Sequence, residues 1–288
     1  MTFEDIVKNY SSYSLDSITS FLSEIMHTVN YTRYLFKNQH LATFYRARKH
    51  NHKDGALKNN QIQLFKNDIE FWNPPEKDIF DYGRCNDKNE SLFYCSNNFK
   101  TCIAEVKPKK DEFITVCSFF PINKCNFFIN PIGINKLQEL NATPTINQIP
   151  KPQGGVLDLD KQLEKLFLLD IKDDEKEKYK LSIAVSKCLL KDITNQFGEI
   201  RNMDGIMYPS LVSNIYKSVN FALIPISVIE NFKVSSIQTF RVLEKNKDKI
   251  TIKLVKNALT HGQKFNCLFW QEIPEKDGEE FTFYCFPT

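Results

Sequence analysis

The chain has 288 residues, of which 42% are hydrophobic and 13% aromatic, so it can fold around one large core and is not a disordered chain. Its 38 basic and 35 acidic residues leave a net charge of +3, which gives no general case for nucleic-acid binding. The opening residues lack a secretory pattern and no apolar run approaches a membrane span, so the sequence predicts a cytoplasmic protein.

The first predicted element is an amphipathic helix from Leu15 to about Asn38. Apolar side chains recur along it at helical spacing. We expect this stripe to pack on the core, and the alternative is an arm that docks a partner. The stripe consists of Ile18, Phe21, Leu22, Ile25 and Val29.

The run Phe44-Tyr45-Arg46-Ala47-Arg48 follows, in a context that favours a β-strand. Because side chains two positions apart in a strand point to the same face, Arg46 and Arg48 are rival candidates for one anion-binding position. His50 and His52 look like a metal pair, but two histidines without a third ligand nearby are more typical of a solvated loop.

The stretch from 82 to 106 has a defined order of local structure. Gly83 permits a tight turn, and the residues from Ser91 to Cys95 favour a short strand. A helix is predicted next, with Ser96 or Asn97 as the cap of its N-terminus.

This helix places Cys102 and Glu105 on one face, because they are three positions apart. Glu105 has apolar neighbours and is expected to be half-buried; the alternative is a solvated helix face. Arg84 offers a flat charged fork suited to phosphate oxygens, and the alternative is a surface salt bridge. Tyr94 is either a stacking platform or a core aromatic. These side chains predict one wall of a site for a phosphorylated ligand.

Two downstream pieces complete the candidate site. The run Asp204-Gly-Ile-Met-Tyr-Pro-Ser210 places a hydroxyl directly after a proline, and Asn220-Phe-Ala-Leu-Ile follows it. Ser210 is a candidate donor to a ribose or a phosphate, and the alternative is a serine that only starts a turn. Ser213 and Ser218 are rival candidates for the same role.

The remaining segments are predicted to mix strands and helices. Phe113 to Phe120 is a predicted strand, Pro144 to Gly155 a loop, and Glu175 to Ile193 a helix. Beyond Ile229 the pattern turns to β, with a turn from Asn246 to Lys249. The expected inward-facing side chains are Leu181, Val185, Cys188 and Leu189 in the helix and Ile250, Ile252 and Leu254 in the strand.

The eight cysteines are expected to be reduced. None forms a CxxC pair, which argues against zinc knuckles and thioredoxin-like sites. Most lie in apolar segments, where a reduced cysteine acts as a small hydrophobic side chain.

The order of these motifs resembles that of the RES domain family. The shared pieces are YR at Tyr45-Arg46, GRxN from Gly83 to Asn86, an aromatic strand, a helix ending in Glu105, and GIxYPS followed by NxAL. The resemblance covers roughly Leu41 to Ile226, and its specificity comes from four motifs in the right order. Cys85 departs from the family pattern, which often has a large aromatic at this position.

The resemblance implies an α+β fold with a reduced ADP-ribosyltransferase-like core. Many members are toxins of bacterial toxin–antitoxin pairs, typically beside a helix-turn-helix antitoxin of the Xre type. They break the nicotinamide–ribose bond of NAD+ with phosphate or water as acceptor, and some members transfer ADP-ribose to a protein instead. Carried over by motif, the functional residues fall on Arg46, Arg84, Tyr94, Glu105 and Ser210.

These residue types suit that chemistry. Nicotinamide departs as a neutral group, and the transition state resembles an oxocarbenium ion, as in glycoside cleavage. Glu105 can hold the sugar hydroxyls and stabilise the growing positive charge, while Arg46 and Arg84 can bind the pyrophosphate. Tyr94 can stack on a ring of the ligand, and Ser210 need not act as a nucleophile.

The sequence therefore predicts an NAD+-degrading enzyme with Glu105, Arg84 and Ser210 as catalytic residues. NAD+ is the expected substrate and inorganic phosphate a candidate co-substrate, without a resident cofactor or metal. A protein-directed ADP-ribosyltransferase and a non-catalytic binding module are the alternatives. The predicted substrate-binding residues are Arg46, Arg48, Tyr94, Asn86, Tyr208 and Asn220.

Three parts are predicted along the chain: a helical extension over residues 1–40, a RES-like core over 41–228 and a β-rich extension over 229–288. The expected macromolecular partner is an antitoxin or regulatory protein, with neither nucleic acid nor membrane involved. The oligomeric state stays open, a dimer included.

Overall fold

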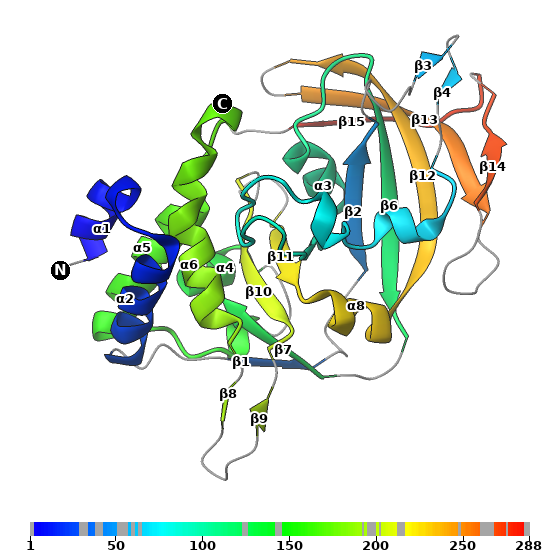
Figure 1. Ribbon diagram of the computed structural model, residues 1–288. Coiled ribbons are helices and arrows are strands. Elements are labelled where there is room, and N and C mark those ends of the chain that lie inside the picture. The colour runs from blue at the N-terminus through cyan, green and yellow to red at the C-terminus, as the bar shows by residue number, and fades with distance from the viewer. Residues whose placement is uncertain are drawn as a thin grey trace.

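The computed structural model describes residues 3–28, 34–37, 43–50, 57–58, 61–62, 65–122, 126–141, 146–191, 193–194, 200–201, 203–211, 217–246, 249–259, 268–274 and 276–284. Within these ranges the chain has an α+β fold built on one mixed sheet (Figure 1). No helix in this part of the chain has both the length and the apolar character needed to span a bilayer.

Strands make up much of the described chain. Most of them belong to the mixed sheet, and four short ones form two separate ribbons. They are β1 (Tyr34–Lys37), β2 (Phe44–Lys49), β3 (Leu57–Lys58), β4 (Gln61–Ile62), β5 (Phe93–Ser96), β6 (Phe113–Pro121), β7 (Asn126–Pro131), β8 (Ile193–Thr194), β9 (Ile200–Arg201), β10 (Gly205–Pro209), β11 (Val219–Leu223), β12 (Phe232–Lys245), β13 (Lys249–Leu259), β14 (Phe269–Glu272) and β15 (Glu280–Tyr284).

The described strands of the sheet follow the order β1-β7-β10-β11-β5-β2-β6-β12-β13-β14, and β15 pairs with β13 as well. Neighbouring strands are antiparallel, except that β7 and β10 run parallel. Strands that carry the candidate motifs, β2, β5, β10 and β11, are thus close neighbours in the middle of the sheet.

The helices are short and lie mainly at one end of the sheet. In Figure 1, α1, α2, α5 and α6 gather beside β10, while the C-terminal strands form the opposite end. They are α1 (Phe3–Asn9), α2 (Leu15–Thr28), α3 (Phe99–Glu105), α4 (Ile134–Glu139), α5 (Gly154–Phe167), α6 (Tyr179–Leu189) and α8 (Pro225–Asn231), with 3-10 turns η1 (Tyr10–Ser12), η4 (Asp68–Phe71), η5 (Glu76–Asp78), η6 (Ile146–Gln148) and η7 (Asp173–Lys178).

The N-terminal helix is shorter than the sequence predicted. It ends at Thr28, and Tyr34–Lys37 is a strand paired with β7, so the predicted extension to Asn38 is wrong. The β-branched and aromatic residues that follow His27 favour extended backbone, and this local preference outweighs the continuing apolar pattern.

The apolar stripe of α2 packs on the core, as predicted. Ile18 and Leu22 are buried and Phe21 and Ile25 are partly buried beside the apolar side chains of α5 and α6. Val29 lies outside the described residues. The described residues of the stripe are therefore packed on the core and are not left exposed for a docking partner.

The two faces of the central strands enter different apolar cores. Ile206 and Tyr208 of β10 pack under the helices, while Met207 between them packs on the opposite face with Phe221 of β11. A third core lies between α3 and the β12–β13 hairpin, where Phe240 is buried. Because successive side chains of a strand point to opposite faces of the sheet, one strand contributes apolar side chains to the cores on both faces.

The α-helix predicted from Glu175 to Ile193 is shorter at both ends in the structure. Its first turn is the 3-10 turn η7, the α-helix spans Tyr179–Leu189, and Ile193 belongs to a short strand. The predicted inward face is confirmed, because all four of its residues are buried: Leu181, Val185, Cys188 and Leu189.

The C-terminal region continues the central sheet. Ile250, Ile252 and Leu254 of β13 are buried, as the alternation predicted, and the predicted strand after Phe113 is β6. The turn before β13 is closed by Asn246, whose side chain accepts a hydrogen bond from Lys249 N at 2.8 Å. Since β12 pairs with β6 along most of its length, no break separates the two regions near residue 228, and the three-part division stays a prediction.

The predicted loop from Pro144 to Gly155 is described only in part. Within it, Ile146–Gln148 forms a 3-10 turn and α5 begins at Gly154, so the loop is shorter than expected.

Candidate functional site

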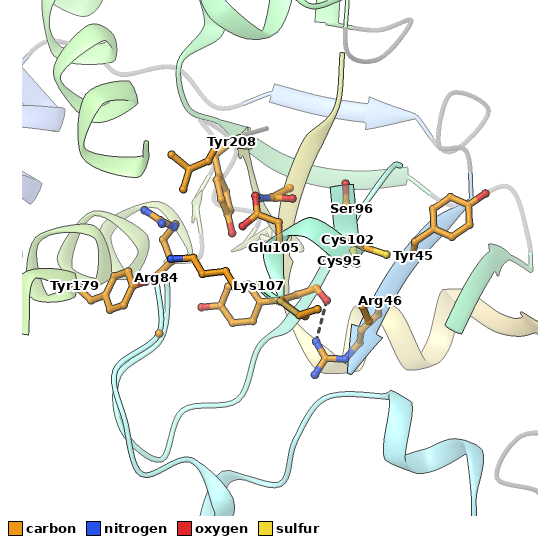
Figure 2. Close-up of a pocket in the computed structure, with 16 residues that line it drawn as sticks. Tyr45, Arg46, Arg84, Cys95, Ser96, Cys102, Glu105, Lys107, Tyr179 and Tyr208 are labelled. Atoms are coloured by element: carbon orange, nitrogen blue, oxygen red, sulfur yellow. Dashed lines mark hydrogen bonds between the residues drawn. The ribbon is translucent and has the colours of Figure 1, made fainter. Parts of the chain in front are cut away.

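A cavity of about 340 Å³ opens where two neighbouring strands of the sheet part. Strand β2 pairs with β6 over its whole length but with β5 through one residue pair, Tyr45 with Ser96. The volume of the cavity lies at the low end of the range of about 300–1,000 Å³ that is common for small-molecule pockets. It is lined by Tyr45, Arg46, Ala47, Gly83, Arg84, Tyr94, Cys95, Ser96, Cys102, Glu105, Val106, Lys107, Tyr179, Tyr208, Leu211 and Asn220 (Figure 2).

One wall of the cavity is a row of side chains across four strands. Tyr208 of β10 pairs with Asn220 of β11, Asn220 pairs with Ser96 of β5, and Ser96 pairs with Tyr45 of β2. Directly opposed residues of neighbouring strands project from the same face of a sheet. The register therefore brings together residues that are up to 175 positions apart in the sequence, Tyr45 and Asn220.

The helix α3 projects Glu105 over this row. Its N-terminus is capped by Asn98, whose side-chain oxygen accepts hydrogen bonds from two main-chain N–H groups. The predicted caps are wrong because both residues bond the neighbouring strand: Ser96 Oγ donates to Val219 O at 2.9 Å, and Asn97 Oδ1 accepts from Val219 N at 2.9 Å.

The carboxylate of Glu105 is held at one oxygen. Ser210 Oγ and Asn220 Nδ2 both donate hydrogen bonds to Oε1, the latter at 2.7 Å. Oε2 accepts no hydrogen bond from the described residues, so it remains available to a ligand. In Figure 2 the carboxylate lies near the middle of the group of lining residues.

Ser210 lies behind this carboxylate. It is 1% exposed and does not line the cavity, so its structural position is that of a donor that orients Glu105. Of its two rivals, Ser218 is buried and shares a hydrogen bond with Thr101 Oγ1 at 2.6 Å, away from the cavity lining. Ser213 lies outside the described residues.

Arg46 is the arginine of β2 that lines the cavity. Nη1 donates to the carbonyl of Tyr94 at 2.8 Å, and the guanidinium carbon lies 5.4 Å from the centre of the Phe93 ring. Burial, with the charge of Arg48 adding to it, lowers the pKa of Arg46 to about 10, so the group stays cationic at neutral pH. Its Nε is buried and has no hydrogen-bond acceptor among the described residues.

Arg48 does not line the cavity, although it was predicted as a binding residue. It donates a hydrogen bond to the carbonyl of Glu70, and its guanidinium lies 5.0 Å from the Phe65 ring centre. Arg48 is thus held by Phe65 and Glu70. Of the two candidate arginines, Arg46 is the one that lines the cavity.

Arg84 occupies the other side of the cavity from Arg46 (Figure 2). Its Nη1 donates to Phe167 O at 2.7 Å and its Nη2 donates to Leu169 O at 2.9 Å. The Tyr179 ring centre lies 5.4 Å from its guanidinium carbon. These contacts fix the plane of the guanidinium and leave other N–H groups for a ligand.

The turn between Arg84 and β5 is closed by Tyr94. Its hydroxyl donates to Asn86 Oδ1 at 2.7 Å and accepts from Cys85 N at 2.8 Å, and burial raises its pKa well above the ordinary value. Asn86 does not line the cavity, although it was predicted to bind substrate; it supports Tyr94 from behind. Cys85 is 2% exposed and packs under the helices, so the departure from the family pattern lies away from the cavity.

Several lining residues were not identified from the sequence. Tyr45 adjoins Arg46 in β2, and because neighbouring side chains of a strand point to opposite faces, no local signal placed both at the cavity. Ser96 is found only through strand register, and Tyr179 reaches the site through tertiary packing. Lys107 follows Glu105 by two positions, lies directly after the C-cap residue Val106 of α3 and has a positive φ of 47°, as is common at this position.

The site of the described chain combines three cations with one carboxylate. Arg46, Arg84 and Lys107 line the cavity together with Glu105. Within the described ranges, no group of three or more His, Cys, Asp or Glu side chains is arranged to bind a metal ion. Such a set of side chains can bind an anionic ligand and stabilise positive charge that develops beside the carboxylate.

Searches of curated proteins and of solved structures found no match to this chain. A family model described as RES domain matches residues 43–242, which is more than half of the chain. The matched range begins one residue before β2, ends within β12 and contains each of the motif segments that meet at the cavity. The chain belongs to the RES domain family.

Proposed function

We propose that this protein is an enzyme that degrades NAD+ by breaking the bond between nicotinamide and ribose. The observation that carries the proposal is the carboxylate of Glu105, which is fixed at one oxygen and open to a ligand at the other, in a cavity that it shares with two arginines. An enzymatic role is consistent with the family to which the chain belongs.

Glu105 supplies the electrostatic part of the mechanism. As the glycosidic bond lengthens, positive charge spreads over the sugar ring, and a fixed carboxylate stabilises this charge without reorganising. Ser210 and Asn220 hold Oε1, so Oε2 can accept a hydrogen bond from a ribose hydroxyl. The electron pair of the broken bond leaves with neutral nicotinamide, and no general acid is required.

The arginines supply the binding part of the mechanism. Arg46 has a buried Nε that still needs an acceptor, and Arg84 is held in a fixed orientation by two carbonyls. Charge-assisted hydrogen bonds of this kind contribute about 1.5–3 kcal/mol each. The rings of Tyr94 and Tyr208 line the same cavity and offer surfaces for the nicotinamide ring.

The family supports a broader biological role. We extend the proposal to a toxin or defence effector whose core is related to ADP-ribosyltransferases, and the mixed α+β sheet is compatible with that relationship. Such an effector would act on a cell by depleting its NAD+.

The test is to incubate the purified protein with NAD+, with and without inorganic phosphate, and to follow nicotinamide and the sugar product by chromatography. Release of nicotinamide with free ADP-ribose or its phosphate supports the proposal. Label retained on a protein indicates transfer to a macromolecule instead. Absence of turnover under all conditions, with Glu105→Gln indistinguishable from the wild type, refutes an enzymatic role.

A further inference from the structure

One short segment of chain contacts two of the cavity's three cations. Residues 167–170, which begin with the last residue of α5 and run toward η7, are called the rim segment below and present three oxygen atoms to these cations. The carbonyls of Phe167 and Leu169 accept hydrogen bonds from Arg84 at 2.7 and 2.9 Å, and Asp170 Oδ1 accepts one from Lys107 Nζ at 2.6 Å. The rim segment therefore satisfies these cations with the kind of atom that a phosphate group would offer.

The backbone position of Lys107 is unfavourable for a lysine. The residue directly follows the C-cap of α3 with a φ of 47°, in the left-handed region where glycine is strongly favoured after a helix. A lysine at this position strains the backbone, but it directs an ammonium group to the cavity two residues after Glu105. Because it reaches the cavity, this side chain can bind an anion there, which is a role that a glycine could not fill.

The ion pair with Asp170 does not account for that role. The side chains of Lys107 and Asp170 are 62% and 66% exposed, so water and salt screen their attraction. Exposed ion pairs of this kind contribute little to stability. An anion that carries more charge and also reaches Arg84 can displace the aspartate from Lys107.

We propose that Lys107 is a substrate-binding residue that binds a phosphate group of a diphosphate-containing ligand together with Arg84, and that Asp170 competes with the ligand for it. The proposal rests on the proposed function, which requires a dinucleotide diphosphate in this cavity. It adds a binding residue beyond the predicted motifs and a carboxylate that tunes the affinity of the site.

Competition predicts effects of opposite sign for the two partners of the ion pair. Lys107→Met weakens the binding of inorganic pyrophosphate about tenfold, because one charge-assisted hydrogen bond is lost at a partly screened site. Asp170→Asn strengthens binding about two- to threefold, because the competing charge is removed. The double variant binds like Lys107→Met, since the aspartate acts only through the lysine.

The experiment is titration calorimetry of inorganic pyrophosphate into the full-length protein and these variants. The matched controls are Lys110→Met and Asp174→Asn, because both residues are exposed and neither lines the cavity. Binding that weakens in both Lys107→Met and Asp170→Asn, or that stays unchanged in Lys107→Met, overturns the proposal.

A second variant separates binding from folding. Lys107→Gly relieves the strained backbone, so its melting temperature should rise by a few degrees while its pyrophosphate affinity falls as in Lys107→Met. A variant that loses both stability and affinity would show that the lysine is structural.

Two outcomes separate the role of Lys107 from the NAD+ activity. A wild type that binds pyrophosphate through Lys107 but releases no nicotinamide refutes the NAD+ activity alone. A wild type that releases nicotinamide, with an unchanged KM for NAD+ in Lys107→Met, refutes the role of the lysine alone.

Discussion

Ser210 and Glu105 are 105 positions apart in the chain, and the hydroxyl of the serine donates a hydrogen bond to the carboxylate of the glutamate. The serine is buried and the glutamate lines the cavity, so one side chain orients the other without facing a ligand. This relationship divides the motif residues into those that line the cavity and those that support them.

Glu105→Gln should lower kcat for nicotinamide release by about 10²–10³-fold, because an amide cannot stabilise positive charge on the ribose as a carboxylate does. The amide oxygen can still accept from Ser210 and Asn220, so the fold and the affinity for pyrophosphate should be retained. Steady-state kinetics and thermal melting check both parts. Equal turnover in the variant and the wild type would contradict the role of the carboxylate.

Ser210→Ala should lower kcat about tenfold and change KM little, because the carboxylate keeps Asn220 as a donor but loses part of its orientation. Ser218→Ala is the matched control, since Ser218 is equally buried but bonds Thr101. Kinetics of the two variants side by side give the measurement. A larger effect in the control would show that stability, not orientation, governs activity.

Arg46→Lys should raise KM for NAD+ by tenfold or more, because lysine keeps the charge but lacks the planar group that bonds Tyr94 O and packs on Phe93. Arg48→Lys is the control from the same strand and should change KM less than threefold, since its guanidinium contacts Glu70 O and Phe65 instead. Equal changes in KM for the two variants would contradict the assignment of Arg46 to the site.

Gly83→Ala should destabilise the turn that carries Arg84. A Cβ there would lie 2.2 Å from Asn86 Oδ1, which accepts the hydrogen bond of the Tyr94 hydroxyl. Displacing this amide leaves a buried hydroxyl without its acceptor, at a cost of about 1–3 kcal/mol in the free energy of unfolding. In a Tyr94→Phe background the same substitution should cost less, and urea denaturation of the four proteins measures the difference. Strictly additive costs would show that the clash acts elsewhere.

The buried cysteines should resist alkylation in the native protein. Burial raises the pKa of Cys85 from 9.0 to about 11, and it raises the pKa of Cys95, Cys102 and Cys117 as well. Because the thiolate is the reactive form, iodoacetamide at pH 8 should leave these four residues unmodified until urea is added. Peptide mapping by mass spectrometry distinguishes the two conditions.

The same shift has a consequence for stability. Between pH 9 and 11 the unfolded chain releases the Cys85 proton before the folded protein does, so the free energy of unfolding should fall as the pH rises through this window. A Cys85→Ala variant should show a shallower decline. An identical decline in both proteins would assign the loss of stability to other groups.

Local sequence patterns predicted the elements that carry the candidate site. The turn at Gly83, the strand before Cys95 and the helix that ends in Glu105 all occur, because glycine, β-favouring and helix-favouring residues act over a few positions. The cap moved to Asn98 because Ser96 and Asn97 are used by β11, which is a long-range contact.

Strand register explains what the sequence could not predict. The row from Tyr208 to Tyr45 exists because β10, β11, β5 and β2 are neighbours, and no local pattern encodes that order. Arg46 and Arg48 have the same local signals, and only the packing of Phe65 and Glu70 against Arg48 separates them. Asn86 likewise became a support for Tyr94 through a contact that depends on the folded turn.

The long pairing of β12 with β6 makes the last part of the chain a neighbour of the strands that carry the candidate site. A protein shortened to its recognisable motifs would leave the main-chain N–H and C=O groups of β6 open to solvent along one side. Such an open strand recruits other chains, so the shortened protein should aggregate instead of reporting the activity of its core. Experiments on this protein therefore need the C-terminal strands in place even where the site of interest lies far from them.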